Sequence, residues 1–149
     1  MRVKECMTTK VELGNPNMSL SEAAKKMRDG DFGVLPIGHN DRLVGMVTDR
    51  DIAIRAVAEG RDPNRVQVGE VMSEGVLYCY EDDDLDDVVR NLGTSKVRRL
   101  PVLNRQKRLV GIVSLGDVAQ TDEDPLKVEA ALCEISKAAP GHDGRVWER

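Results

Sequence analysis

The sequence predicts a mixed α/β fold made of two copies of one unit, each with the order strand, helix, strand, strand, helix. Three observations predict it. Blocks of sequence recur at an offset of 65 residues, one residue is inserted in the second copy, and apolar residues alternate between helical and strand spacing within each copy.

The repeat keeps its register along most of the chain. The matching ranges are 3–7 with 68–72, 20–27 with 85–92, 35–37 with 100–102, 43–48 with 109–114, and 51–53 with 117–119. The inserted residue falls between polar stretches, at 39–42 in the first copy and 104–108 in the second. Both stretches lie between two apolar runs, so each is predicted to be the tip of a β-hairpin.

Each predicted element follows from its own residues. A short first strand is expected near Val11–Leu13 in the first copy and Val76–Tyr80 in the second. The helix that follows carries an apolar stripe in both copies, at positions 20, 23, 24 and 27 and at positions 85, 88, 89 and 92. Ser19 and Glu22 form a capping box at the start of the first helix, and Gly30 follows its end.

The second helix of each copy is expected to begin at Thr48 or at Ser114. The apolar residues of the first are Ile52, Ala53, Ala56 and Val57, while the second is shorter because 121–125 interrupts it. Val128, Ala131, Leu132 and Ile135 then predict a C-terminal helix, followed by a disordered tail around 139–144. The expected organisation is repeat 1 at 1–62, repeat 2 at 63–122, and a C-terminal helix with tail at 123–149.

Composition narrows the classes of function. The chain has 149 residues, of which 40% are hydrophobic but only 3% aromatic, and its net charge is −4. These values exclude a collagen-like chain, a disulfide scaffold and a wholly disordered chain. Few rings and no concentration of basic charge argue against a nucleic-acid partner.

Three isolated cysteines, Cys6, Cys79 and Cys133, predict reduced thiols. No run of residues is long and apolar enough for a membrane span, and Met1–Glu5 has no apolar core of a signal peptide. The expected location is the cytoplasm, with no membrane partner.

The strongest chemical motif is Gly-x-Val-Thr/Ser-x-x-Asp at a strand-to-helix junction. It occurs at 45–51, with Thr48 and Asp51, and at 111–117, with Ser114 and Asp117. A hydroxyl at a helix N-terminus can donate to a phosphate oxygen, and an Asp one turn later can accept from ribose hydroxyls. The same residues also fit a plain N-cap with an acid at the third helical position, which would be purely structural.

The two units resemble a tandem pair of CBS domains, the motif named after cystathionine β-synthase. The resemblance covers residues 3 to 120 and rests on the element order, the Leu-Pro-Ile and Leu-Pro-Val strands, and the two junction motifs. It implies a module with a pseudo-twofold axis and two clefts that take adenosine-containing ligands such as AMP, ADP or ATP. It also implies that Asp51 and Asp117 contact ribose, while Thr48 and Ser114 lie near phosphate. Such modules usually form homodimers through their helices.

Arg98 and Arg99 precede the second Leu-Pro pair, where the family often carries a basic pair directed at phosphates. The fork of donors on arginine suits that role, although exposure on a strand explains the same residues. Gly33 and Val34 stand at the matching positions of the first repeat. The clefts are therefore expected to differ, with the cleft of Asp51 the better one for a charged nucleotide.

These residues predict a regulatory module, not an enzyme, that binds an adenine nucleotide and reports its state to a partner protein whose identity the sequence leaves open. The alternatives are a structural dimerisation module with unoccupied clefts, and a module for NAD(H) or S-adenosylmethionine. The acidic run 81–87 lacks the spacing of a calcium loop, so it predicts no metal site but an acidic first helical turn. No catalytic constellation of His, Ser or Cys can be assembled, and no covalent cofactor is expected.

Overall fold

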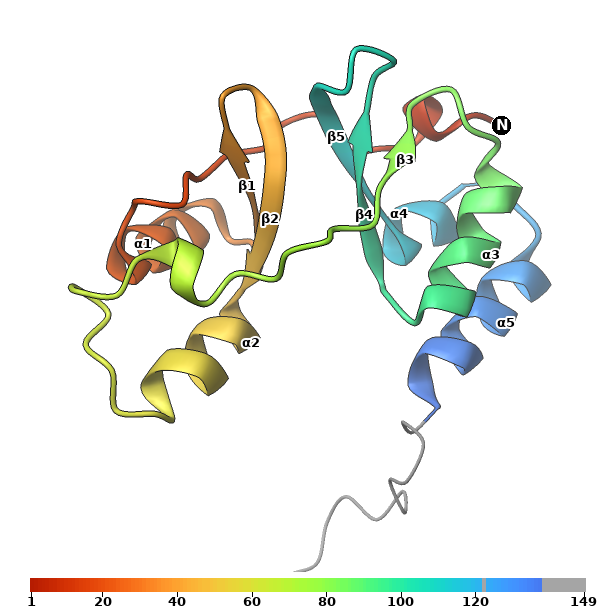
Figure 1. Ribbon diagram of the computed structural model, residues 1–149. Helices are drawn as coiled ribbons and strands as arrows, with labels where there is room; N and C mark the ends of the chain where they lie inside the picture. The colour runs from red at the N-terminus through yellow and green to blue at the C-terminus, as the bar shows by residue number, and fades with distance from the viewer. Residues whose placement is uncertain (122, 138–149) are drawn as a thin grey trace, which may run out of the picture.

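The computed structural model describes residues 1–121 and 123–137, which form two similar units side by side (Figure 1). The first unit contains α1 (Leu20–Gly30), β1 (Val34–His39), β2 (Arg42–Thr48), α2 (Asp49–Ile52) and the π-helical turn η2 (Ala53–Val57). The second contains β3 (Cys79–Tyr80), α3 (Leu85–Ser95), β4 (Arg99–Leu103), β5 (Leu109–Ser114) and α4 (Leu115–Ala119). The predicted mixed fold of two repeats is confirmed. The predicted C-terminal helix is α5 (Pro125–Ser136).

Both hairpins form where the polar stretches predict them. β1 pairs antiparallel with β2, and β4 pairs antiparallel with β5. The first hairpin turns at Asn40 and Asp41, whose φ angles are 52° and 62°. Two residues with positive φ match the twist of the flanking strands, and Asn and Asp tolerate that conformation best after Gly.

The predicted first strand of each repeat is largely wrong. Val11–Leu13 forms no strand, and only Gly14 bridges to Ile37 of β1. In the second repeat the strand is reduced to Cys79–Tyr80, which pairs parallel with β4. The reason is that both segments cross the gap between the units and have little length left for pairing (Figure 1).

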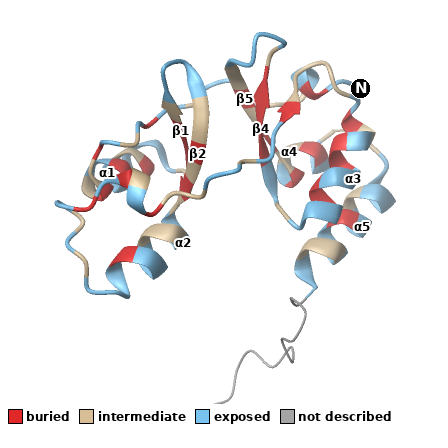
Figure 2. Cartoon of the chain, viewed as in Figure 1, coloured by how far each residue is buried: buried red, intermediate tan, exposed pale blue. Residues whose placement is uncertain are grey.

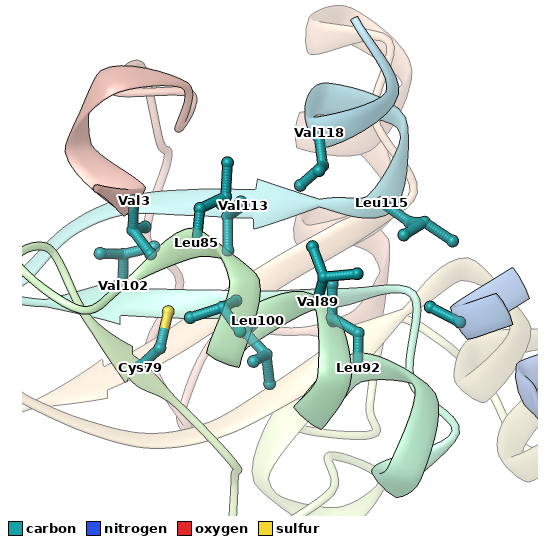
Figure 3. Close-up of a cluster of buried hydrophobic side chains, with 12 residues drawn as sticks. Val3, Cys79, Leu85, Val89, Leu92, Leu100, Val102, Val113, Leu115 and Val118 are labelled. Carbon is teal, nitrogen blue, oxygen red and sulfur yellow. The ribbon is translucent and has the colours of Figure 1, made fainter. Parts of the chain in front are cut away.

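The start of each repeat packs in the unit formed by the other repeat. The 3₁₀ turn η1 (Val3–Glu5) opens the first repeat in sequence, yet Val3 is fully buried in the core of the second unit (Figure 3). The matching turn η3 (Val68–Glu70) belongs to the start of the second repeat, yet Val68 is fully buried in the core of the first unit. The sequence repeats and the packed units therefore differ at their first segments.

The residues that follow η1 and η3 form backbone hydrogen bonds with a strand of that same other unit. Thr8 exchanges hydrogen bonds of 2.8 and 2.9 Å with Ile112 of β5, and Ser73 exchanges bonds of 2.8 and 3.0 Å with Met46 of β2. Gly111 and Gly45 let these segments approach the sheets. A Cβ atom at Gly111 would lie 2.7 Å from the carbonyl oxygen of Thr8, and one at Gly45 would lie 2.9 Å from that of Ser73.

The amphipathic helices bury most of the predicted stripes (Figure 2). All four stripe positions of α3 are buried, whereas in α1 Ala24 is exposed. The end of α1 also differs from the prediction, because Gly30 is helical and Asp31 takes the left-handed conformation, with φ 55°. A Cβ at Gly30 would lie 2.2 Å from the ring of Phe32, so that ring would have to move if Gly30 were replaced.

Helix α5 packs along α3 of the second unit (Figure 1). Gly93 of α3 permits this contact, since a Cβ at that position would lie 3.1 Å from Cα of Ala131. Lys127 Nζ adds an ion pair to Asp86 at 2.6 Å. Of the predicted stripe, Ala131 is buried, Val128 and Ile135 are half-buried, and Leu132 is exposed. The predicted disordered tail lies outside the described residues, among which no helix is long and apolar enough to cross a membrane.

The exchange predicts which unit each valine stabilises. Val3→Ala should lower the free energy of unfolding by roughly 1.5–3 kcal/mol through lost burial and a cavity. In hydrogen exchange it should speed the amides of β4 and β5, whereas Val68→Ala should speed those of β1 and β2. Lys4→Ala, at an exposed neighbouring position, is the control. Faster exchange in β1 and β2 of the Val3 variant would contradict the packing.

Thiol chemistry tests the burial of the three free cysteines. Burial, reinforced by the charge of Asp83, raises the pKa of the Cys79 thiol to about 12. Cys133 is exposed on α5. Because the thiolate is the reacting form, iodoacetamide at pH 8 should label Cys133 well before Cys79, as mass spectrometry of peptides would measure. Equal alkylation rates of Cys79 and Cys133 in the folded protein would contradict the burial of Cys79 in the core of the second unit.

Candidate ligand-binding clefts

Two of the clefts between the units contain residues of the junction motifs, and each is bordered by one of the segments that cross between the units, residues 8–12 or 73–77, here called the crossing segments. The larger, here called the Thr48 cleft, has a volume of about 660 Å³ and lies between the end of β2 and the start of β4. Segment 73–77 closes one side of it, and Ile135 of α5 contributes at its edge. Its lining is mostly apolar but includes the hydroxyl-bearing Thr48 and four basic residues: Arg50, Lys96, Arg98 and Arg99.

The second cleft, here called the Ser114 cleft, has a volume of about 480 Å³ and lies between the end of β5 and the start of β1. Segment 8–12 borders it, as segment 73–77 borders the Thr48 cleft. Ser114 and Asp117 both line it. The two clefts thus use equivalent parts of the two repeats, as a pseudo-twofold arrangement requires.

The junction motifs form reciprocal caps in both repeats. The backbone N–H of Thr48 donates to Oδ2 of Asp51, and the N–H of Asp51 donates to Oγ1 of Thr48, each at 3.0 Å. Ser114 and Asp117 make the same two bonds at the same distances. The purely structural interpretation of these motifs is therefore realised in the fold, which leaves one oxygen of each carboxylate for other contacts.

The two aspartates differ in what surrounds that remaining oxygen. Asp117 lines the Ser114 cleft directly. Oδ1 of Asp51 instead lies 3.8 Å from the guanidinium of Arg55, and Asp51 is not among the residues that line the Thr48 cleft. The Ser114 cleft therefore joins both predicted residues of its motif, while the Thr48 cleft has only the hydroxyl at its surface.

The basic pair lies where the sequence predicts it, at the Thr48 cleft. β4 starts at Arg99, which pairs with Ser114 of β5, and the carbonyl oxygen of Arg98 accepts from Leu115 N–H at 2.9 Å. Both arginines line the Thr48 cleft, and Arg99 also lines the Ser114 cleft. Their role toward a ligand stays a prediction.

The sequence motifs did not point to several lining residues. The crossing segments contribute Lys10 and Glu12 to one cleft and Glu74 to the other, and helix ends contribute Asp31 and Lys96. Extending the repeat alignment finds Asp31 and Lys96, because they stand at matching positions. Nothing local in the sequence places Ile135 at the Thr48 cleft, since that requires α5 to lie along α3.

The acidic run 81–87 has structural partners. Asp84 caps α3 by accepting from the Asp86 N–H at 2.9 Å, and Asp83 accepts from the Tyr80 N–H at 2.9 Å. Asp82 pairs with Arg105 at 2.9 Å, which holds the pKa of that carboxyl below its usual range. Across residues 1–121 and 123–137, no group of three or more His, Cys, Asp or Glu side chains is arranged to hold a metal ion.

Comparison with known proteins agrees with this architecture. The family model of the CBS domain matches the chain twice, at residues 3–57 and 68–124. The chain belongs to the CBS domain family. The two matches cover the repeats in tandem, so the protein carries a CBS pair, and each cleft lies between its two members.

Two curated relatives match this chain along most of their own length. The CBS domain-containing protein YhcV of Bacillus subtilis is 40% identical over 134 residues, which cover 90% of this chain and 94% of YhcV. Hypoxic response protein 1 of Mycobacterium tuberculosis is 38% identical, covering 78% of this chain and 82% of its own. The crystal structure of Hypoxic Response Protein I, with two coordinated zinc ions, matches with a TM-score of 0.73 and 37% identity over 80% of this chain and 98% of its own.

One solved relative contains adenosyl ligands. The CBS domain pair of protein MJ0100 was solved in complex with 5′-methylthioadenosine and S-adenosyl-L-methionine. It matches with a TM-score of 0.71 and 30% identity, covering 80% of this chain and 98% of that structure.

The caps predict a stability effect without any ligand. Asp117→Ala should lower the free energy of unfolding by about 1 kcal/mol, because the Ser114 N–H loses its acceptor. Asp51→Ala should act similarly, and urea denaturation measures both. Glu129→Ala, at an exposed position of α5, is the control. A change no larger than that of the control would show that the caps add nothing to stability.

Proposed function

We propose that this CBS pair is a regulatory module that binds adenosine-containing ligands, AMP, ADP or ATP, in its clefts and passes their presence to a partner protein. The observation that carries the proposal is the composition of the Thr48 cleft. It combines an apolar wall with a hydroxyl and four basic side chains at one interface between the repeats. A nucleotide needs both parts, an apolar surface for the base and donors for the phosphates.

The base would lie against aliphatic side chains. Val34, Met46, Val76 and Leu77 line the Thr48 cleft, and no aromatic residue does so among the described ones. Small-molecule sites generally combine such apolar walls with a few placed polar groups. Arg98 and Arg99 would then contact the phosphates, since a guanidinium can hold two oxygens at once.

The ribose assignment is better supported in the Ser114 cleft. Asp117 lines that cleft and keeps one oxygen outside its cap, so it can accept from vicinal hydroxyls. In the Thr48 cleft, Asp51 would have to share its second oxygen with Arg55, 3.8 Å away. Thr48 and Ser114 would lie near the phosphate or the 5′ group.

Ligand binding would be passed to a partner through the segments that border the clefts. The crossing segments connect the two units, and Ile135 brings α5 to the edge of the Thr48 cleft. A ligand that contacts both units favours one of their relative orientations by its difference in affinity. A partner that contacts α5 or the helices could then sense that orientation.

A homodimer is part of this proposal. Ile54 and Val57 of the first unit are 46% and 63% exposed, and Leu126 of α5 is 71% exposed. These apolar side chains are suited to a contact between copies. A cytoplasmic location also belongs to the proposal and is supported by the three free thiols.

Other ligands of the same class remain the second candidate. The complex of MJ0100 with 5′-methylthioadenosine and S-adenosyl-L-methionine favours adenosyl ligands without phosphate as an alternative for one or both clefts. A structural module with unoccupied clefts is the remaining alternative. Enzymatic activity is not part of this proposal.

A thermal-shift screen over AMP, ADP, ATP, NADH and S-adenosylmethionine tests the proposal. A ligand at about 100 times its Kd adds roughly 2.7 kcal/mol to the free energy of unfolding and raises Tm. Hydrogen exchange of 125–137 should also slow when the ligand binds, because Ile135 borders the Thr48 cleft.

The matched variants are Arg98→Ala and Arg90→Ala. Arg98 lines the Thr48 cleft, whereas Arg90 lies on α3 and is exposed. Only the Arg98 variant should lose Tm response to ATP. Absence of any shift with all five compounds would favour the structural module with unoccupied clefts.

A further inference from the structure

The two clefts carry different charges at equivalent positions of the repeat. Lys96 and Asp31 are 65 residues apart, end α3 and α1, and share the left-handed conformation, with φ angles of 56° and 55°. Lys96 lines the Thr48 cleft and Asp31 lines the Ser114 cleft. One backbone position therefore presents a cation to one cleft and a carboxylate to the other.

Two further pairs differ in the same direction. Arg98 lines the Thr48 cleft, while its counterpart Gly33 lines the Ser114 cleft without any side chain. A Cβ at Gly33 would lie 2.8 Å from Oδ2 of Asp49, so a carboxylate lies beside that position. Leu77 of one crossing segment corresponds to Glu12 of the other.

The resulting balance differs in sign. The Thr48 cleft has four basic side chains and one carboxylate, that of Glu74. The Ser114 cleft has three carboxylates, those of Glu12, Asp31 and Asp117, against two basic side chains. Lys26, at 3.6 Å, partly balances Glu12, but among the described residues neither Asp31 nor Asp117 has an ion pair within 4 Å.

Arg99 makes the two clefts dependent on each other. It lines both of them, and so does its counterpart Val34, which carries no charge. The first repeat therefore has no arginine equivalent to Arg99, and both clefts share this one guanidinium. A phosphate that binds Arg99 from the Thr48 cleft would leave Lys10 as the one basic side chain of the Ser114 cleft.

We propose that the clefts select their ligands by charge. The Thr48 cleft takes an adenine polyphosphate, and the Ser114 cleft takes an adenosyl compound without phosphate, whose 5′ group is neutral or cationic. This rests on the proposed function, because both ligands share the adenosine part. A phosphate chain in the Ser114 cleft would face more carboxylates than basic side chains, and like charges at close range repel each other, whereas a neutral or sulfonium group would not be repelled.

Calorimetry with ATP and 5′-methylthioadenosine as probes tests this selection. The wild-type protein should bind one ATP per chain and one 5′-methylthioadenosine per chain, and saturation with either should not remove the site for the other. Higher salt should weaken ATP and leave 5′-methylthioadenosine nearly unchanged, because screening acts on the charged ligand.

The decisive variants exchange charges between positions with the same backbone conformation. Asp31→Lys should create a second site for ATP, and Lys96→Asp should weaken ATP about ten-fold, the equivalent of roughly 1.4 kcal/mol. Lysine and aspartate are each already accommodated at the counterpart position. Asp29→Lys and Lys25→Asp, which change the same charges on exposed positions of α1 away from both clefts, are the matched controls.

The outcomes distinguish selection by charge from nucleotide binding in general. A second ATP site in Asp31→Lys, absent from Asp29→Lys, supports selection by charge. Competition between the two probes for one site, or the same ATP stoichiometry in Asp31→Lys and wild type, would overturn it while leaving the nucleotide module intact. Failure of both probes to bind any variant would overturn the proposed function together with the inference.

Discussion

The structure depends on the exchange of the first segments between the two repeats. Val3, at the start of the first repeat, completes the core of the second unit, and Val68, at the start of the second repeat, completes the core of the first. Units of about 60 residues bury only about 60% of the surface that their unfolded chain exposes, and they are marginal alone. Because each core contains a valine from the other repeat, the units are expected to fold as one.

The exchange also creates the clefts. The start of each repeat packs in the core of one unit, and the chain then crosses to the sheet of the other unit. The crossing residues 8–12 and 73–77 therefore border the clefts between the units. The glycines at 45 and 111 permit this path by leaving room for the backbone of Ser73 and Thr8. Packing requirements and cleft formation thus come from the same chain path.

The two repeats are alike in their helix caps and differ in the charges at the edges of their clefts. The caps made by Thr48 with Asp51 and by Ser114 with Asp117 are geometrically the same, because each repeat needs them to start a helix after a strand. Charges at the cleft edges differ, since an exposed side chain at a helix end is not constrained by packing. The retained caps show why the junction motif by itself cannot separate a structural role from ligand binding.

The sequence alone determined the repeat, both hairpins, the helical stripes and the residues of the junction motifs, because these depend on local spacing and turn chemistry. The resemblance to the CBS family, not the repeat itself, led to the expectation that Arg98 and Arg99 lie at the cleft of Thr48, which they line. Only the tertiary structure decided that Val11–Leu13 crosses between units instead of forming a strand, that Asp117 lines its cleft whereas Asp51 does not, and that Ile135 lines the Thr48 cleft. Each of these depends on contacts between residues distant in sequence, which no local pattern records.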